Sequence, residues 1–381
     1  MHLNNLLKSS LAVFSLAGFV IISSCSNKSN MADSSIKDTF GKMPTEDLNK
    51  FGELKPVNSK PKWGKDMTDP MAVVIEKLSS YNAPPLIGLT AQDARKQPSP
   101  ADAAMDVMKD RNISMPQNNI DTAAKEIPVK GGKINIRIYT PKTGKAIYPV
   151  IVYYHGGGWV IANLDTYNAS AEGLANQVEA IVVSVAYRQA PEHKFPTAHN
   201  DSYAAYEWIV KNAGSLKGDP KRIALVGESA GGNLAAAVSM MARDKGMQLP
   251  VHEVLVYPIA GYDFNTDSYK ESDSIKPLNN GLMKWFFEKY LNSPSDGKNP
   301  MISLVNANLR GLPPTTIIGA QYDPLRTEGK TLADNLEKAG VATKYKLYKG
   351  TTHEFFGMAA LVPEAKDAQA LAAAELKNVF K

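Results

Sequence analysis

Ser229 lies in a stretch of sequence that could present its hydroxyl as a nucleophile. It stands in GESAG, where the apolar run RIALVG leads into the helix-forming run NLAAAVSMMARD. This order predicts a strand, a sharp turn and a helix, with Gly227 and Gly231 allowing the strand and the helix to approach closely. The chemistry indicated is attack on a carbonyl carbon, although GxSxG alone is short enough to occur often by chance.

A serine hydroxyl is a weak nucleophile near neutral pH, so it needs a base to accept its proton and a carboxylate to orient that base. His353 follows a predicted late strand in GTTHEFF, and Asp323 follows the predicted strand TTIIG. Because parallel strands end at a common edge of the sheet, we expect both side chains to lie beside Ser229. The alternative for Asp323 is a helix cap before Pro324.

The other histidines are weaker candidates for the base. His2 would be removed with an N-terminal signal, and His252 begins a predicted strand. His193 and His199 lie in or near a polar loop that contains prolines. We therefore assign the base to His353.

Attack on a carbonyl also requires hydrogen-bond donors for the negative oxygen of the tetrahedral intermediate, and loss of one donor can cost about 2.7 to 4 kcal/mol. The string HGGGW, residues 155–159, follows the predicted strand PVIVYY. Because Gly156, Gly157 and Gly158 have no side chains, their backbone N–H groups can point at a substrate oxygen, and the N–H of Ala230 would add a further donor. A loose turn is the alternative for the three glycines.

Composition narrows the class of protein. The chain has 381 residues, 44% of them hydrophobic, which is enough for one large domain with a small appendage. Its net charge of +5 is mild, and no dense Lys/Arg block alternates with aromatic residues, which argues against nucleic-acid binding. A phosphate-binding turn is the alternative for residues 227–232, but GxGxxG and a Lys-Ser/Thr pair are both absent there. We expect neither a metal nor an organic cofactor.

The N-terminus has the layout of an export signal. Lys8 precedes an apolar run at residues 11–22 that is too short to span a bilayer, and small residues follow it. The string ISSC ends at Cys25, the only cysteine, and resembles the bacterial lipobox, whose cysteine is acylated and becomes the new N-terminus. We expect residues 1–24 to be a signal peptide and the lipidated Cys25 to hold the exported protein on the cell envelope, at the periplasmic face or the outer membrane. An ordinary signal peptide is the alternative.

The region between the signal and the main domain is polar. Residues 25–65 are rich in Ser, Asn, Lys, Asp and Pro, which predicts a flexible tether. Helices are then predicted from Asp69 and, with a capping pattern at Ser99, through Met108.

The main domain is predicted to span residues 66–381 and to carry a cap. An aromatic-rich helix within residues 261–300 interrupts the alternation of strands and helices. We expect this segment and residues 66–122 to form the cap, because ligands of open α/β sheets bind at the carboxyl ends of the strands. An ordinary crossover is the alternative for residues 261–300.

The order of elements predicts the fold class. KEIPV and INIRIY, separated by Gly131 and Gly132, predict a hairpin. Apolar strand-like runs then alternate with helical segments, which predicts an α/β fold with a mainly parallel sheet and helices on both faces. These runs are residues 149–154, 180–186, 222–226, 251–257, 315–318 and 343–347.

The chain resembles the bacterial hormone-sensitive-lipase-like (family IV) carboxylesterases, which have the α/β-hydrolase fold. The resemblance covers about residues 68–380 and rests on HGGGW at 155–159, YRQAPE at 187–192, GESAGG at 227–232, DPL at 323–325 and the histidine at 353. It implies that Ser229 is the nucleophile, Asp323 the acid and His353 the base. Their order along the chain is the order of that fold.

The resemblance also implies supporting roles for other residues. Gly157, Gly158 and Ala230 are similar in position to the oxyanion donors, and His155 to a structural support; Tyr187, Arg188 and Glu192 would brace the site.

The chain departs from the family pattern at Glu228, where Asp is common, at Glu354, where Gly is common, and at Thr327 in DPLRT. We expect the carboxylate of Glu354 to narrow the pocket entrance or to disfavour anionic substrates.

The expected activity is hydrolysis of short-chain acyl esters through an acyl-enzyme. Two alternatives stay open, which are a non-catalytic ligand-binding or scaffold protein on a hydrolase fold and an amide or peptide hydrolase. Retention of the serine, the acid and the base argues against the first, and a compact helical cap disfavours the second. The expected partners are a small-molecule ester and, through Cys25, a membrane surface; the oligomeric state is open, a homodimer included.

Overall fold

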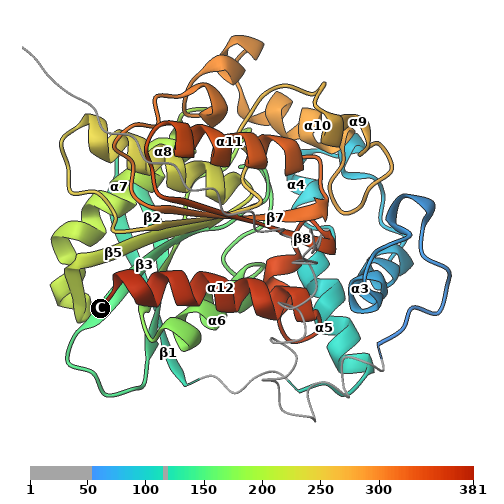
Figure 1. Cartoon of the computed structure of the whole chain (residues 1–381), viewed down its shortest axis with the longest axis horizontal. Coiled ribbons are helices and arrows are strands. Elements are labelled where there is room, and N and C mark those ends of the chain that lie inside the picture. The colour runs from blue at the N-terminus through green and yellow to red at the C-terminus, as the bar shows by residue number, and fades with distance from the viewer. Residues whose placement is uncertain (1–53, 115–118) are drawn as a thin grey trace, which may run out of the picture. The chain divides into compact units, whose positions relative to one another are not determined.

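A mixed, mainly parallel sheet organises the chain (Figure 1). The computed structural model describes residues 54–114 and 119–381. Their strands are β1 Ile120–Val129, β2 Gly132–Pro141, β3 Tyr148–Tyr154, β4 Ile181–Ala186, β5 Gly218–Glu228, β6 Glu253–Val256, β7 Thr315–Tyr322 and β8 Thr343–Thr352. They lie in the order β1-β2-β4-β3-β5-β6-β7-β8, antiparallel from β1 to β4 and parallel from there on. The predicted fold class is confirmed.

The described helices flank this sheet. They are α3 Asp69–Ser80, α4 Ala91–Ala94, α5 Pro100–Asp110, α6 Asn168–Val178, α7 Thr197–Asn212, α8 Ala230–Asp244, α9 Asp267–Lys270, α10 Asn280–Tyr290, α11 Arg326–Lys338 and α12 Pro363–Val379. Short 3₁₀ helices are η1 Lys62–Gly64, η2 Leu86–Gly88, η3 Ala213–Leu216, η4 Pro294–Lys298, η5 Leu304–Asn306 and η6 Phe355–Met358. Within the described ranges, no helix is both long and apolar enough to cross a membrane.

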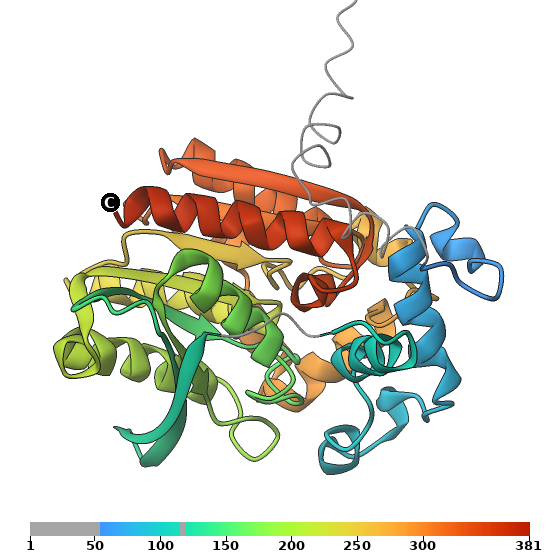
Figure 2. The ribbon, with the colours of Figure 1, turned by 90° about the horizontal axis from the view of Figure 1, so that it is seen from below.

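Both faces of the sheet are buried, which explains the nearly continuous apolar strands. Every residue of β3 is buried, and its side chains alternate between two hydrophobic cores. Val150 and Val152 pack in the core that contains α7, α8 and α11, whereas Ile151 and Tyr153 pack in the core that contains α6 and α12. Figure 1 shows α8 and α11 on one side of the sheet and α6 and α12 on the other, and Figure 2 shows α12 and α6 from their own side.

Local sequence signals set several element boundaries. The predicted β1–β2 hairpin is present, with Ile127 opposite Ile134 in the antiparallel register. The helix from Asp69 is confirmed as α3, and Ser99 forms a capping box with Asp102 at the start of α5. The polar, proline-containing loop predicted in or near His193 and His199 ends at Pro196, and His199 lies buried in the first turn of α7.

Several strands differ in length from the predicted runs, and the differences at β6, β7 and β8 affect the candidate site. β7 and β8 extend beyond their apolar stretches to Tyr322 and Thr352. They were underestimated because pairing continues past the predicted ends, with Ala320 opposite Tyr348 and Tyr322 opposite Thr352. Conversely, β6 ends before Tyr257, whose positive φ of 34° breaks the extended backbone. The longer strands carry the chain directly to Asp323 and His353.

The N-terminal boundaries also differ from the predicted ones. Residues 54–65 were predicted as the end of the tether, but Leu54 is buried and Asn58 donates its backbone N–H to Glu76 on α3 at 2.8 Å. Apolar packing therefore begins before the predicted domain start. The rest of the tether, the signal peptide and Cys25 lie outside the described residues.

The segments predicted to form a cap contact one another. η2 lies against α10, and Lys276 Nζ lies 3.5 Å from Ser79 Oγ. However, β1 begins at Ile120, so the last three residues of the predicted segment 66–122 belong to the sheet. The division of the predicted cap from the rest of the domain stays a prediction.

Candidate active site

Ser229 occupies a strained turn between β5 and α8. Its backbone has φ 56° and ψ −118°, a combination that L-residues rarely adopt. A Cβ on Gly227 would lie 2.1 Å from the carbonyl oxygen of Gly231, and a Cβ on Gly231 would lie 1.9 Å from that of Tyr154. The predicted need for glycine on both sides of the serine is therefore confirmed, and the turn lifts the hydroxyl above the carboxyl end of β5.

The structure brings Ser229, His353 and Asp323 into one hydrogen-bonded chain. Nε2 of His353 lies 2.9 Å from Oγ of Ser229, and Nδ1 lies 2.7 Å from Oδ2 of Asp323. With a proton on Nδ1, the imidazole donates to Asp323 and its Nε2 can accept the serine proton. All three side chains are buried, so bulk water competes little for these bonds.

Asp323 does not form the helix cap considered from the sequence, because the N-cap of α11 is Leu325, but its side chain stabilises the turn before that helix. Its Oδ1 accepts the N–H of Leu325 at 2.8 Å, in the turn that leads into α11. The turn therefore holds one carboxylate oxygen, while the other is directed at His353. The side chain of Asp323 therefore both stabilises this turn and orients His353.

Candidate oxyanion donors surround the serine from two elements. Ala230 is the first residue of α8, where N–H groups have no acceptor within the helix. In the glycine loop, the N–H groups of Gly157 and Gly158 have no intramolecular acceptor in the described ranges. The N–H groups thus remain available for a substrate oxygen. Gly156 lies in the same loop and uses its carbonyl to accept from the Tyr187 hydroxyl at 3.2 Å.

Helix α10 packs on this loop. Gly158 has φ 59°, and a Cβ placed on it would lie 2.2 Å from the ring of Phe286. Phe286 is buried, as is Trp285 beside it. The aromatic helix predicted to line a pocket therefore packs directly on the candidate oxyanion loop.

His155 and Tyr187 support the glycine loop from behind. Their rings stack with centroids 4.3 Å apart, and the Tyr187 hydroxyl donates to the carbonyl of His155 at 2.9 Å. Burial lowers the pKa of His155 to about 4, although its bond to the Gly156 carbonyl opposes the shift. At neutral pH this imidazole is uncharged, which suits a structural support.

Arg188 and Glu192 lie farther from the chemistry than the resemblance implied. Arg188 pairs with Asp201 on α7 at 2.7 Å, and Glu192 pairs with Arg95 next to α4 at 2.7 Å. In the described part of the chain, neither bonds to Ser229, His353 or Asp323. They fix the loop at residues 187–192, which bonds to the end of HGGGW through the Ala190 N–H and the Trp159 carbonyl at 2.9 Å.

The pKa of His353 reflects opposing effects. Burial alone would lower it, but the charge and hydrogen bond of Asp323, together with the carboxylates of Glu354 and Glu228, raise it above its ordinary value. Protonated His353 is therefore stabilised, which favours the state that forms when the serine gives up its proton.

Two tyrosines hold Glu228, the residue before the nucleophile at which the chain departs from the family pattern. The hydroxyls of Tyr153 and Tyr257 each donate to its carboxyl group at 2.5 Å. Burial, followed by the charge of Glu354, raises the pKa of Glu228 to about 7. Neither tyrosine was identified from the sequence. Their positions could have indicated them, because Tyr153 lies near the end of β3 and Tyr257 directly follows β6, at the edge of the sheet where Ser229 lies.

Other polar groups lie apart from this site. The buried His199 bonds to the Tyr290 hydroxyl at 2.7 Å, and His252 bonds to Thr316 at 3.0 Å. No cluster of three or more His, Cys, Asp or Glu side chains suited to a metal ion occurs in the described ranges.

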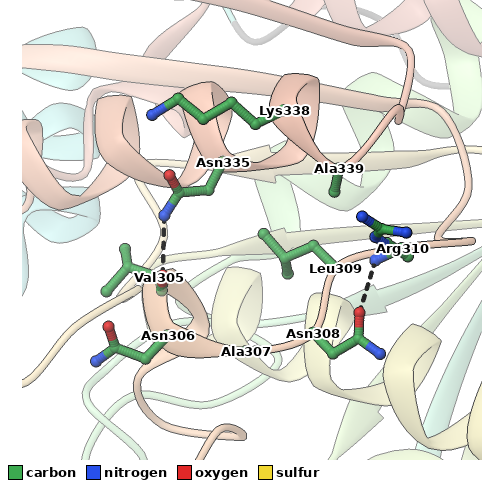
Figure 3. Close-up of a pocket in the computed structure, with 9 residues that line it drawn as sticks. All are labelled: Val305, Asn306, Ala307, Asn308, Leu309, Arg310, Asn335, Lys338 and Ala339. Carbon is green, nitrogen blue, oxygen red and sulfur yellow. Dashed lines mark hydrogen bonds between the residues drawn. The ribbon is translucent and has the colours of Figure 1, made fainter.

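A surface cavity of about 300 Å³ contains none of the predicted site residues (Figure 3). Lys338 and Ala339 at the end of α11 line one side, and the segment 305–310 lines the other. It therefore adds nothing to the candidate active site.

A family model described as the alpha/beta hydrolase fold matches residues 151–357. The chain belongs to the α/β-hydrolase family. The match begins in β3 and includes Ser229, Asp323 and His353, so the region that defines the family contains all three hydrogen-bonded side chains.

Relatives in this family include named esterases. A carboxylesterase NlhH of Mycobacterium tuberculosis is 39% identical over 251 residues, which are 65% of this chain and 79% of the relative. An ethyl acetate hydrolase of Pseudomonas putida is 30% identical, over 74% of this chain and 88% of its own length.

A solved structure has the same fold and a related sequence. A thermostable esterase from Pseudomonas putida has a TM-score of 0.76 and 30% identity, covering 83% of this chain and 98% of its own. The family thus contains esterases that match almost the whole described domain.

Proposed function

We propose that the protein hydrolyses short-chain carboxylic esters through an acyl-enzyme on Ser229. The observation that carries the proposal is the hydrogen-bonded chain from Ser229 through His353 to Asp323, next to free N–H groups of a glycine loop. The esterases among the relatives support the same reaction class.

Each step of the proposed reaction uses a group already in place. Oγ of Ser229 attacks the ester carbonyl as Nε2 of His353 takes the proton, and the N–H groups of Gly157, Gly158 and Ala230 stabilise the oxyanion. His353 then returns the proton to the leaving alcohol. Water, activated by the same imidazole, attacks the acyl-enzyme and releases the acid.

Short acyl groups are favoured by the contact between α10 and the glycine loop. Phe286 fills the space above Gly158, and the nucleophile itself is only 4% exposed. A long acyl chain would have to displace buried aromatic side chains, whereas an acetyl or butyryl group requires much less space.

The experiment is hydrolysis of p-nitrophenyl acetate, butyrate and octanoate by the wild-type protein and by Ser229→Ala. We expect kcat/KM to be highest for the two short esters and activity to be lost in the variant. Equal inactivity of both proteins on all three esters would remove the esterase proposal, and a preference for octanoate would remove the short-chain part.

We also propose that the enzyme works while anchored to a membrane through lipidated Cys25. The support is the sequence alone, namely an apolar run that ends in ISSC with no other cysteine in the chain. An anchored esterase would meet its substrates in the cell envelope.

A further inference from the structure

The carboxylate of Glu354 stands beside the two reacting side chains. Its Oε1 lies 3.8 Å from Nε2 of His353, the nitrogen that also faces Ser229. The same oxygen accepts the hydroxyl of Tyr167 at 2.6 Å. A second acidic group, besides Asp323, is thus fixed next to the imidazole.

In the described part of the chain, the only ion-pair partner of this carboxylate is His353, and only while the imidazole is protonated. Among the described residues, no Lys or Arg forms an ion pair with Glu354, and its side chain is 19% exposed. Oε2 accepts no hydrogen bond within the same ranges, whereas Oε1 is used by Tyr167. Asp323 and Glu228 add further carboxyl groups near His353, so the site as a whole favours positive charge.

Tyr167 and Glu354 lie close to the place where the substrate is expected to bind. A Cβ on Gly156 would lie 2.2 Å from the Tyr167 hydroxyl, so Tyr167 and Glu354 lie along the glycine loop. Nε2 of His353 must come within hydrogen-bond reach of the leaving alcohol oxygen to return its proton. A group attached to that alcohol therefore lies near Glu354.

We propose that Glu354, held by Tyr167, forms a subsite for a positively charged group on the alcohol part of the ester. The inference rests on the proposed esterase function and adds the class of substrate. A cation there would complete the ion pair that the protein leaves open, and it would be attracted into a site that is shielded from solvent.

The test compares acetylcholine with 3,3-dimethylbutyl acetate, its uncharged analogue of the same shape. The measurement is made at about pH 8.5, because burial raises the pKa of Glu354 above the ordinary carboxyl value of about 4.3. The quantity measured is the ratio of the two kcat/KM values. We expect this ratio to fall about fivefold to tenfold in Glu354→Gln, which keeps the side-chain shape, because one nearby charge is removed.

Two further variants make the result specific. Glu354→Gly should lower the ratio equally, and its backbone is compatible because Glu354 has φ 71°. Glu126→Gln, on exposed β1, is the matched control and should leave the ratio unchanged.

Hydrolysis of the uncharged ester by the wild-type protein, and its loss in Ser229→Ala, reports on the esterase function separately. If the wild-type protein and Glu354→Gln hydrolyse that ester but have the same ratio, the subsite is overturned while the esterase function stands. If the wild-type protein hydrolyses the uncharged ester but does not accelerate the hydrolysis of acetylcholine, the subsite is overturned as well.

Discussion

At the residue scale, the protonation state of His353 decides when Ser229 can be activated. The imidazole must be neutral at Nε2 to accept the serine proton, and the carboxylates around it raise its pKa. Activity should therefore appear as pH rises through a pKa above the ordinary histidine value of about 6.5.

Asp323→Asn tests this balance. Removing the negative charge should move the acidic limb of kcat/KM to lower pH, because the imidazolium loses its main stabilising partner. The maximal kcat should fall on the order of a thousandfold or more, because an amide no longer holds the productive tautomer. The measurement is a pH profile with p-nitrophenyl acetate; an unshifted limb with normal kcat would exclude Asp323 as the acid.

At the element scale, helix α10 packs on the glycine loop, where Phe286 lies against Gly158 and Tyr290 stacks on Trp159. Gly158→Ala would place a methyl group against Phe286 and would also strain a backbone with φ 59°. We expect kcat to fall roughly 100-fold because an oxyanion donor is displaced.

Gly158→Ala combined with Phe286→Ala should recover part of that loss, since the second substitution makes room for the methyl group. Phe286→Ala alone gives the baseline for a double-mutant cycle. Additive losses in the double variant would show that Phe286 does not control the loop.

A buried carboxyl group lies between α8 and the sheet. Glu253 accepts the hydroxyls of Ser239 at 2.8 Å and Thr315 at 3.0 Å, and burial raises its pKa to about 7. The folded protein therefore holds this proton more tightly than the unfolded chain. The resulting stability is complete below the unfolded carboxyl pKa and is lost as pH rises through about 7.

Glu253→Gln should remove this pH dependence. Between about pH 6 and pH 9, the free energy of unfolding of the wild-type protein should decline on the order of 1 to 3 kcal/mol more than that of the variant. Urea unfolding at both pH values measures it. Parallel declines in the two proteins would mean that Glu253 does not titrate in this range.

Sequence patterns were sufficient for the elements but not for several contacts between them. Strand runs, caps and the GxSxG turn are local, and they predicted β3, α3, α5 and the position of Ser229. The contact of Phe286 with Gly158, and that of Tyr167 with Glu354, join residues far apart in the chain. Such contacts depend on how helices pack at the end of the sheet, which spacing along the sequence does not encode.

At the scale of the whole molecule, the proposed lipid anchor determines where the enzyme works. Cys25→Ser should move the protein from the membrane fraction to the soluble fraction, because acyl chains contribute roughly 0.8 kcal/mol per buried CH₂. Cell fractionation with an immunoblot measures the partition. Asn27→Ser is a nearby control, and membrane association unchanged by Cys25→Ser would contradict the anchor.

The most direct test of the central claim is to trap the acyl-enzyme. The wild-type protein is mixed with p-nitrophenyl acetate, quenched in acid during turnover, digested and analysed by mass spectrometry. We predict one acetyl group on the peptide that contains Ser229, and none in Ser229→Ala, with p-nitrophenol released in a burst by the wild-type protein alone. Turnover that persists in Ser229→Ala, or acetylation confined to another side chain, would contradict the claim that Ser229 is the nucleophile.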